Sequence, residues 1–389
     1  DNEMGKRTDP PPSLAPSLAH SLTRSSGAFD VVLGNPPYGS LLSLREKSFV
    51  RRQHREVASA HNTAAYFISL AWSLTRRGGR VGLVVPKSVT YSYAWIGTRN
   101  LLINSLCSVV DVGRAWKHVL LEQVLLTFTP KEKPAETVSL RRLSEHTRVP
   151  ARTTDARVIH RLGILPTGLS EEDNALLNFL VANSDSTLAQ ACSTRRGTGL
   201  QKFLTADGTL PVLAGRDIAD FATLTYSRFI DPSEVASNRL RLTYPGQAVF
   251  QNIVAHLTKP SDHIRLIGTI VDERLACLDT VNLIEVAGSG ITPSIVCGLL
   301  MSNLVNWFLY VCVYNRAIRT MHFDGYFLAK VLLPTTDRLY GLEEIAAILR
   351  ENPKSCEGWN ALNDAVYDAF RIPPSLRGYV EQMHRPRWV

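Results

Sequence analysis

The stretch FDVVLGNPPYGS, Phe29–Ser40, decides how the first part of this chain is interpreted. Its apolar half predicts a strand through Val31 and Leu33, because aliphatic and β-branched residues favour an extended backbone. The strand must then stop, since Pro36 and Pro37 each fix φ at about −65° and remove a backbone donor. Turn geometry accounts for the two prolines. It does not account for the amide before them or the aromatic residue after them, so the turn is also a candidate functional site.

The residues that follow this turn show an α/β pattern. A basic connection is expected from Arg45 to Glu56, and then an apolar helix near Thr63 to Arg76 that ends at glycines 78 and 79. The segment RVGLVVP, residues 80–86, shows no alternation and predicts a strand buried on both faces, as in a parallel sheet. A helix over 94–106 leads to the strand segments SVVDVG and EQVLLTFTP. Their connection is too short for a parallel crossover, so we expect these two strands to pair antiparallel.

A domain boundary is expected between Arg148 and Ser170, where the strand and helix periods are lost. The chain beyond it carries shorter, mixed signals. NALLNFLVAN predicts a helix, LPVLAGRDI and RFID predict strand pieces, a long apolar helix starts near Ile295, and an amphipathic helix ends at Pro373. The sequence therefore predicts an α/β first domain and a mixed α/β second domain.

Charge is distributed unevenly over the 389 residues, which are 45% hydrophobic and carry a formal charge of +8. Residues 1–150 hold 20 Lys and Arg against 11 Asp and Glu, and the remainder holds 23 against 24. The basic first part fits a polyanionic partner such as nucleic acid, although basic solvated surfaces are common enough to make charge alone a weak indication.

Cysteine usage and hydropathy bear on the compartment. The six cysteines are scattered, without a CxxC pair or metal-ligand spacing, which predicts reduced thiols in a cytoplasmic protein and no metal site. The apolar run Ile295–Val313 is long enough to span a membrane, but Ser302, Asn303 and Asn306 lie at its centre, so a buried helix is expected instead. The sequence begins with Asp and shows no signal peptide, which suggests a start inside a longer protein.

The chemistry of the turn follows from its residue types. An amino group on an aromatic ring is a weak nucleophile, because its lone pair is delocalised into the ring. Two hydrogen-bond acceptors facing this amino group would return electron density to nitrogen, and the Asn35 side-chain oxygen and the Pro36 carbonyl can supply them. Tyr38 can lie flat against an extruded base.

These residues resemble a known family. NPPY after the FDVVLG strand is similar to the catalytic motif of N6-adenine DNA methyltransferases, in particular those with a TaqI-like specificity domain and the related type IIG restriction-modification enzymes. FISLAWSLTRRGGRVGLVVPKSVTY, residues 67–91, resembles the family's helix, double-glycine turn and following strand. GRAWKHVLLEQVLLTF, residues 113–128, resembles its late hairpin. RRGTG, VLAGRDI, GLLMSNLVNWFLY and MHFDGYFLAKVLLP resemble successive pieces of its recognition domain, so the resemblance covers nearly the whole chain.

The resemblance implies a domain plan and an activity. Residues 1–28 would be a loop or tail, 29–147 the C-terminal half of a Rossmann-like class I methyltransferase domain, and 165–389 a TaqI-like target-recognition domain. Asn35, Pro36, Pro37 and Tyr38 would form the catalytic motif, and Trp116 would pack on the flipped adenine unless it is only a core residue. The reaction would be adenine-specific, site-specific DNA methylation with S-adenosyl-L-methionine in a restriction-modification system.

DNA-binding residues are expected in both domains. Arg51 and Arg52 lie on the segment that leaves the catalytic turn, where phosphates that flank a flipped base are natural partners. In the second domain the basic cluster comprises Arg195, Arg196, Lys202 and Arg216. The predicted partner is double-stranded DNA, with no membrane involved.

The usual glycine-rich cradle for the cofactor precedes NPPY in the family, and 34 residues are too few to build it. The chain is therefore expected to be inactive without a missing N-terminal half or another subunit, such as a restriction subunit. The GxG in NLIEVAGSGITPSI, residues 282–295, is a weak alternative cofactor loop. Two other functions remain open: a DNA-binding specificity module, and a protein-glutamine N5-methyltransferase, which uses the same motif on an amide.

Overall fold

The computed structural model describes residues 27–40, 42–57, 59–114, 121–130, 137–142, 152–223, 226–287, 290–318 and 320–388. The chain divides into a first unit, Asp1–Gly163, and a second unit, Ile164–Val389. The division falls in the interval between the two expected domains, and β6 and α5 occupy part of that interval.

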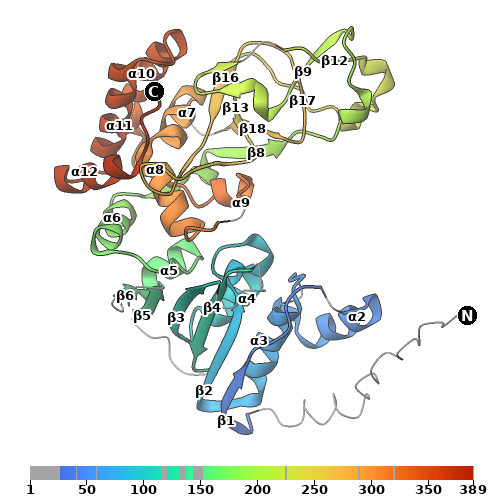
Figure 1. Ribbon diagram of the computed structural model, residues 1–389, viewed down its shortest axis with the longest axis vertical. Coiled ribbons are helices and arrows are strands. Elements are labelled where there is room, and N and C mark those ends of the chain that lie inside the picture. The colour runs from blue at the N-terminus through green and yellow to red at the C-terminus, as the bar shows by residue number, and fades with distance from the viewer. Residues whose placement is uncertain are drawn as a thin grey trace, which may run out of the picture. The chain divides into compact units, whose positions relative to one another are not determined.

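The first unit is built on a mixed six-stranded sheet in the order β1-β2-β4-β3-β5-β6 (Figure 1). Strands β1 and β2 are parallel, and β4 runs antiparallel to both β2 and β3, which confirms the pairing expected for the last two strands. The strands are β1 Phe29–Gly34, β2 Thr75–Pro86, β3 Leu106–Gly113, β4 Gln123–Phe128, β5 Thr137–Arg142 and β6 Arg152–Asp155. The helices are α2 Leu44–Gln53, α3 Thr63–Leu74, α4 Ile96–Leu102 and α5 Ala156–Leu162.

Strand β2 differs from its prediction in length and burial. Helix α3 ends at Leu74, and the strand starts at Thr75, so both glycines lie inside β2 rather than at a helix end. A Cβ on Gly79 would stand 2.8 Å from the Asp30 carbonyl oxygen, which is why a small residue is needed beside β1. Burial on both faces was wrong: α3 packs against β2, whereas Gly82 and Val84 stay partly exposed.

The basic segment expected to be a connection forms helix α2 instead. Ser43 caps its first turn by accepting from the Glu46 amide, and the Glu46 side chain accepts from the Ser43 amide in return. This capping box satisfies backbone donors that have no partner inside the helix. None of the α2 residues is buried, so the helix presents its basic side chains to solvent.

The second unit combines small sheets with a group of helices. Its main sheet is four-stranded and antiparallel, in the order β16-β13-β18-β8, and a three-stranded sheet has the order β12-β9-β17. The strands are β7 Ser186–Thr187, β8 Cys192–Arg196, β9 Leu210–Leu213, β10 Ile218–Ala219, β11 Ala222–Thr223, β12 Phe229–Ile230, β13 Gln247–Gln251, β14 Ala255–Leu257, β15 His263–Arg265, β16 Gly268–Val271, β17 Ala276–Cys277, β18 Val281–Val286 and β19 Leu332–Leu333. The helices are α6 Glu171–Ala182, α7 Pro293–Met301, α8 Asn303–Trp307, α9 Gly325–Leu328, α10 Gly341–Glu351, α11 Cys356–Ala369 and α12 Pro374–Met383.

The long apolar helix expected from Ile295 is bent. Helix α7 ends at Met301, the hydroxyl of the next residue, Ser302, caps α8, and α8 continues as a π-helix over Phe308–Val313. The two halves meet at 59°, and across the described residues no single helix is long and apolar enough to cross a membrane, although this bent pair would qualify jointly by length and composition. Inside the unit, Asn306 donates to the Leu300 and Ser302 carbonyls and accepts from the Leu266 amide, which satisfies its buried amide group.

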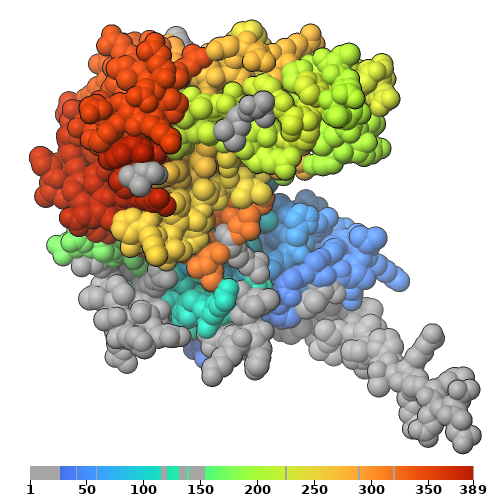
Figure 2. Space-filling model, turned by 45° about the horizontal axis from the view of Figure 1, so that its top comes forward, coloured from blue at the N-terminus to red at the C-terminus, as the bar shows by residue number. Residues whose placement is uncertain are grey.

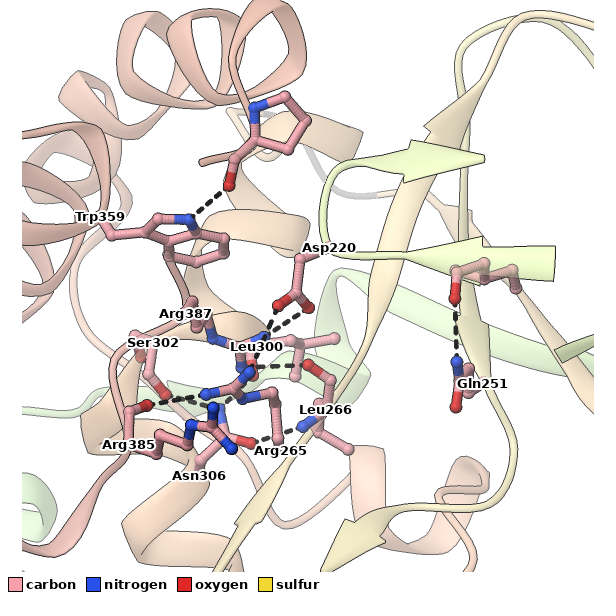
Figure 3. Close-up of polar contacts among 12 residues, drawn as sticks. Asp220, Gln251, Arg265, Leu266, Leu300, Ser302, Asn306, Trp359, Arg385 and Arg387 are labelled. Atoms are coloured by element: carbon pink, nitrogen blue, oxygen red, sulfur yellow. Dashed lines mark hydrogen bonds and ion pairs between the residues drawn. The ribbon is translucent and has the colours of Figure 1, made fainter. Parts of the chain in front are cut away.

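Arginines anchor the segment after α12 to the rest of the second unit (Figure 3). Arg387 donates to the Asp220 carboxylate at 2.6 Å and to the Leu266 carbonyl at 3.1 Å, and it lies over the Trp359 ring. Arg265 donates to the Arg385 carbonyl at 2.7 Å. Figure 2 shows the C-terminal helices, in red, packed against segments drawn in orange and yellow.

Candidate active site

The turn after β1 places an amide side chain at the carboxyl end of a parallel strand. Gly34 is the last paired residue of β1 and lies opposite Leu83 of β2. The next residues cannot extend the ladder, because neither proline has an N–H to donate. Pro36 is buried, whereas Asn35 and Pro37 are exposed. The turn therefore holds Asn35 at an accessible edge of the sheet, where open α/β sheets bind their ligands.

Tyr38 is tied to Asn35 through its hydroxyl group. This hydroxyl lies 3.2 Å from the Asn35 Oδ1 and 3.2 Å from the Val84 carbonyl oxygen of β2. Partial burial raises the pKa of Tyr38, so the hydroxyl remains a donor around neutral pH. Since an amide oxygen has two lone pairs, Asn35 can accept from Tyr38 and from a second donor.

An apolar groove of about 280 Å³ lies beside this turn. Leu33, Asn35 and Pro37 line one side of it, and Phe67 and Leu70 of helix α3 line another. The Phe67 side chain is 42% exposed, which is unusual for a ring on a helix that otherwise packs on the sheet. The groove can accommodate a flat or aliphatic group next to the Asn35 side chain.

A buried ion cluster lies at the same edge of the sheet. Lys87, directly after β2, is 2.9 Å from an Asp111 carboxylate oxygen and 2.8 Å from a Glu122 carboxylate oxygen. Their side chains are 2%, 1% and 9% exposed. Asp111 is near the end of β3 and Glu122 directly precedes β4, so Lys87 joins both ends of the connection between these strands. That connection contains Trp116, which lies outside the described residues.

Sequence reasoning missed this cluster. Lys87 was quoted in the stretch that resembles the family, but no partner was assigned to it. Its two carboxylates are distant in sequence, and only strand pairing brings them together, so the available signal was limited to an apolar strand followed by a lone Lys.

The structure places the predicted DNA-binding residues of the first unit on α2. Arg51 and Arg52 lie in the last turn of this helix, and both side chains are exposed. The helix begins six residues after Tyr38. Its Lys47 Nζ donates a hydrogen bond of 2.6 Å to the Ser40 hydroxyl, just beyond the turn. Their contact with phosphates stays a prediction.

The four basic residues predicted in the second unit have different surroundings. Arg195 pairs with Glu285 across β8 and β18 at 2.6 Å, and Lys202 lies 4.8 Å from the centre of the Phe203 ring. Arg196 donates through Nε to the Asp279 carbonyl. The Arg216 side chain is 72% exposed, with Nε 3.9 Å from an Asp217 carboxylate oxygen. The cluster is thus not one continuous patch of unpaired charge.

The candidate glycine loop is not placed like a nucleotide cradle. The strand before it, β18, pairs antiparallel with both β13 and β8, whereas dinucleotide and S-adenosylmethionine cradles follow a parallel strand. Two of its residues, 288 and 289, lie outside the described part. All six cysteines are free thiols, and the described residues contain no group of three or more His, Cys, Asp or Glu that could hold a metal ion.

Comparison with known proteins gives one family match. Residues 12–115 match the family model described as Eco57I restriction-modification methylase. A curated protein of Methanocaldococcus jannaschii, described as "Putative type II restriction enzyme and methyltransferase", is 33% identical over 79 residues, which are 20% of this chain and 6% of that protein.

Solved structures of restriction-modification enzymes are similar to the chain at low identity. The type IIG restriction endonuclease BpuSI is 10% identical over 90% of this chain and 55% of its own, with a TM-score of 0.35. The DrdV–DNA complex is 10% identical over 87% of this chain and 45% of its own, with a TM-score of 0.40. A nuclease-deletion mutant of the Type ISP enzyme LlaGI, in complex with a DNA substrate mimic, is 10% identical over 86% and 42%, with a TM-score of 0.39.

The chain spans 6% of the curated relative and between 42% and 55% of these three structures. The match to the family model covers β1, the turn Asn35–Tyr38, helices α2 to α4 and strands β2 and β3. The part of the chain that carries the candidate active site therefore lies within the stretch that matches the restriction-modification methylase model.

Proposed function

We propose that this protein is the catalytic and specificity part of a site-specific DNA methyltransferase that methylates the N6 amino group of an extruded adenine, within a restriction-modification system. The observation that carries the proposal is the exposed Asn35 side chain at the carboxyl end of β1, followed by two prolines and Tyr38. The match of residues 12–115 to a restriction-modification methylase supports the reaction class.

Asn35 and Pro36 would act on the amino group of the base. The Asn35 Oδ1 and the Pro36 carbonyl would each accept one amino hydrogen, which moves electron density from the ring to nitrogen and favours a pyramidal amine. That nitrogen would form the bond to the methyl carbon while the bond from this carbon to the sulfonium sulfur of the donor breaks, which leaves a neutral thioether, and the extra proton on nitrogen would pass to water. S-adenosyl-L-methionine would supply the methyl group as an electrophile.

Tyr38 would hold the base. Its single hydroxyl proton lies within reach of both the Asn35 Oδ1 and the Val84 carbonyl oxygen, so rotation of the ring away from the amide would cost the hydrogen bond that it donates there. A base stacked on this ring would present its amino group to Asn35. Trp116 stays the proposed second aromatic contact.

The described residues fit the methyl acceptor but do not build a cradle for the cofactor. Within the described part of the chain, strand β1 is the edge of the sheet, and its residues Phe29, Val31 and Leu33 are 46%, 57% and 77% exposed. An edge strand with this much exposed apolar surface is a template for further pairing. We therefore assign the cradle to a further segment beside β1, supplied by an N-terminal half of a longer protein or by another subunit.

The open edge of β1 also favours a second candidate. A specificity module would contribute Asn35 and DNA contacts and depend on a partner chain for the cofactor. Both versions predict the same turn chemistry, and they differ in whether the missing segment is covalently attached.

The test uses the chain expressed with the coding sequence directly upstream of it. We expect this preparation to transfer labelled methyl groups to duplex DNA, with N6-methyladenine as the product on nucleoside analysis. The chain alone should bind S-adenosyl-L-methionine weakly and show no transfer. Label in protein glutamine instead of DNA would favour the N5-methyltransferase and contradict the proposal.

The role of Asn35 is tested in the same preparation. Asn35→Ala should lower the single-turnover rate by roughly 100-fold or more and leave DNA affinity nearly unchanged, because the interaction is made with the reacting amino group. Asn100→Ala, an exposed position on α4, is the matched control and should keep the full rate. A normal rate for Asn35→Ala would refute the assigned role.

A further inference from the structure

A recess of about 350 Å³ opens in the second unit, away from the Asn35 turn in sequence. Its lining includes the segment around Gly215 and Arg216, the end of β13 at Gln251, and the turn that carries Thr280. Arg228 and Ile253 also line the recess. Of these residues, only Arg216 was singled out by the sequence.

The recess is held open by a fixed turn, Leu278–Thr280. Gly215 donates its amide to the Thr280 hydroxyl at 2.9 Å, and a Cβ on Gly215 would stand 2.7 Å from the Thr280 carbonyl oxygen. Arg196 donates to the carbonyl of Asp279 in the same turn. The two segments that resemble the recognition domain, RRGTG and VLAGRDI, thus converge on one turn, and glycine is required at their contact.

Among the described residues that line the recess, Arg216 is the cation exposed at the rim. Arg228 is only 17% exposed and pairs with Asp217, which also accepts the Ala214 amide at 2.8 Å. Arg216 is 72% exposed and reaches Asp217 only at 3.9 Å. Since Asp217 has Arg228 as its near partner, the guanidinium of Arg216 keeps its donors for a ligand.

Gln251 supplies a fixed acceptor on the same wall. Its Nε2 donates to the Ile218 carbonyl at 2.9 Å, as Figure 3 shows, which sets the orientation of the amide. The Oε1 then faces away from that bond. The recess therefore combines a forked donor, an oriented acceptor and the apolar side chain of Ile253, which is 47% exposed.

We propose that this recess reads one G·C base pair from the major groove, with Arg216 donating to guanine O6 and N7 and Gln251 Oε1 accepting from the cytosine N4 amino group. The inference rests on the proposed function, because it takes duplex DNA as the ligand. A guanidinium fork matches the two acceptors of guanine, and the opposite base of that pair offers the donor that Gln251 needs. An A·T pair also offers an amino donor, from adenine. In place of the two guanine acceptors, however, it offers only the single thymine O4 acceptor.

The experiment is a selection of duplexes with randomised sequence by the purified chain, followed by affinity measurements on the selected site. We expect a selected motif with one G·C pair that Arg216→Gln no longer distinguishes, a loss of about 5- to 150-fold at that position alone. Gln251→Met should weaken the preference at the same pair. Arg274→Gln changes an exposed arginine that does not line the recess and should leave the motif intact.

Arg216→Lys separates base readout from a phosphate contact. Lysine keeps the charge but loses the fork, so the variant should keep overall affinity and salt dependence while losing the guanine preference. The double variant Arg51→Gln, Arg52→Gln should weaken all sequences alike.

Each contrary outcome identifies what has failed. Equal weakening of all sequences by Arg216→Gln would mean a phosphate contact and overturn the inference. An unchanged motif in both recess variants, or no motif selected by the wild-type chain, would overturn it as well while DNA binding stands. Absence of any duplex binding at low salt would overturn the proposed DNA partner together with the inference. Thermal melting of each variant checks that it is folded.

Discussion

At the turn after β1, the Tyr38 hydroxyl is shared between the Asn35 side chain and the backbone of β2. The proposed function would thus give this residue two separable roles, which are stacking of the base on its ring and orientation of Asn35 by its hydroxyl. The stacking role of the ring was proposed from the sequence and stays a prediction. Sequence reasoning could not foresee the hydroxyl bonds, because they depend on how the two prolines bring residue 38 back over residue 35 and against Val84.

Substitutions at Tyr38 should separate these roles. Tyr38→Phe keeps the ring and loses the one hydroxyl proton that Asn35 and Val84 share, so the single-turnover rate should fall about 3- to 10-fold, in line with roughly 0.5–1.5 kcal/mol for a hydrogen bond. Tyr38→Ala should also lose the stacking of the extruded base on the ring, worth roughly 1–3 kcal/mol. Fluorescence of 2-aminopurine at the target position reports extrusion, and it should be quenched in the Phe variant but not in the Ala variant. Equal behaviour of the two variants would show that the ring does not hold the base.

Among the elements, the strand ends at β2, β3 and β4 are fastened by Lys87 between Asp111 and Glu122. Lys87→Met would remove the ammonium group that lies against the two buried carboxylates. Because breaking a buried pair from one side costs roughly 3–5 kcal/mol, we expect a large fall in the urea midpoint of the first unit. The triple variant with Asp111→Asn and Glu122→Gln removes the uncompensated charge and should recover much of the loss. No recovery would indicate that Lys87 acts by packing rather than by charge.

Elements with an apolar face could be predicted, and elements without one could not. β1, α3 and the β3–β4 pair follow directly from aliphatic runs and connection length. α2 was missed because no residue of it is buried, so hydrophobic periodicity has nothing to detect. Its signal was the pair Ser43 and Glu46 at capping-box spacing. The same limit applies to the recess, where side chains from distant segments meet only after the sheets have formed.

At the scale of the whole molecule, the segment after α12 places a buried histidine, His384, close to several basic side chains. His384 Nδ1 lies 2.8 Å from the Val380 carbonyl oxygen, and its Nε2 is buried without a partner among the described residues. Burial first, and then the charges of His263, Arg387 and Arg265, lower the pKa of His384 to about 3. Asp220 is the carboxylate that balances these arginines.

The stability of the second unit should therefore fall in acid. Below pH 6.5 this histidine is protonated in the unfolded chain, whereas in the folded chain it stays neutral down to about pH 3. The buried neutral ring therefore costs no stability above pH 6.5, and the free energy of unfolding falls as the pH drops from 6.5 toward about 3. His384→Asn can keep the bond to Val380 without titrating. The wild-type free energy of unfolding should drop between pH 7 and 4 by up to about 1.4 kcal/mol per pH unit more than that of the variant. Parallel pH profiles would mean that the histidine is not buried in solution.

Strand β8 has a consequence for the order in which the protein is made. Its register partner is β18, with Arg196 opposite Asn282, so the ribosome must add all the residues between them before the ladder can close. At about 5–20 residues per second, synthesis of these residues takes about 4 to 17 s, and β8 stays unpaired with β18 on the nascent chain during that time. Arg195 and Arg196 are then charged gatekeepers on an unpaired strand, and they oppose its association with other nascent chains.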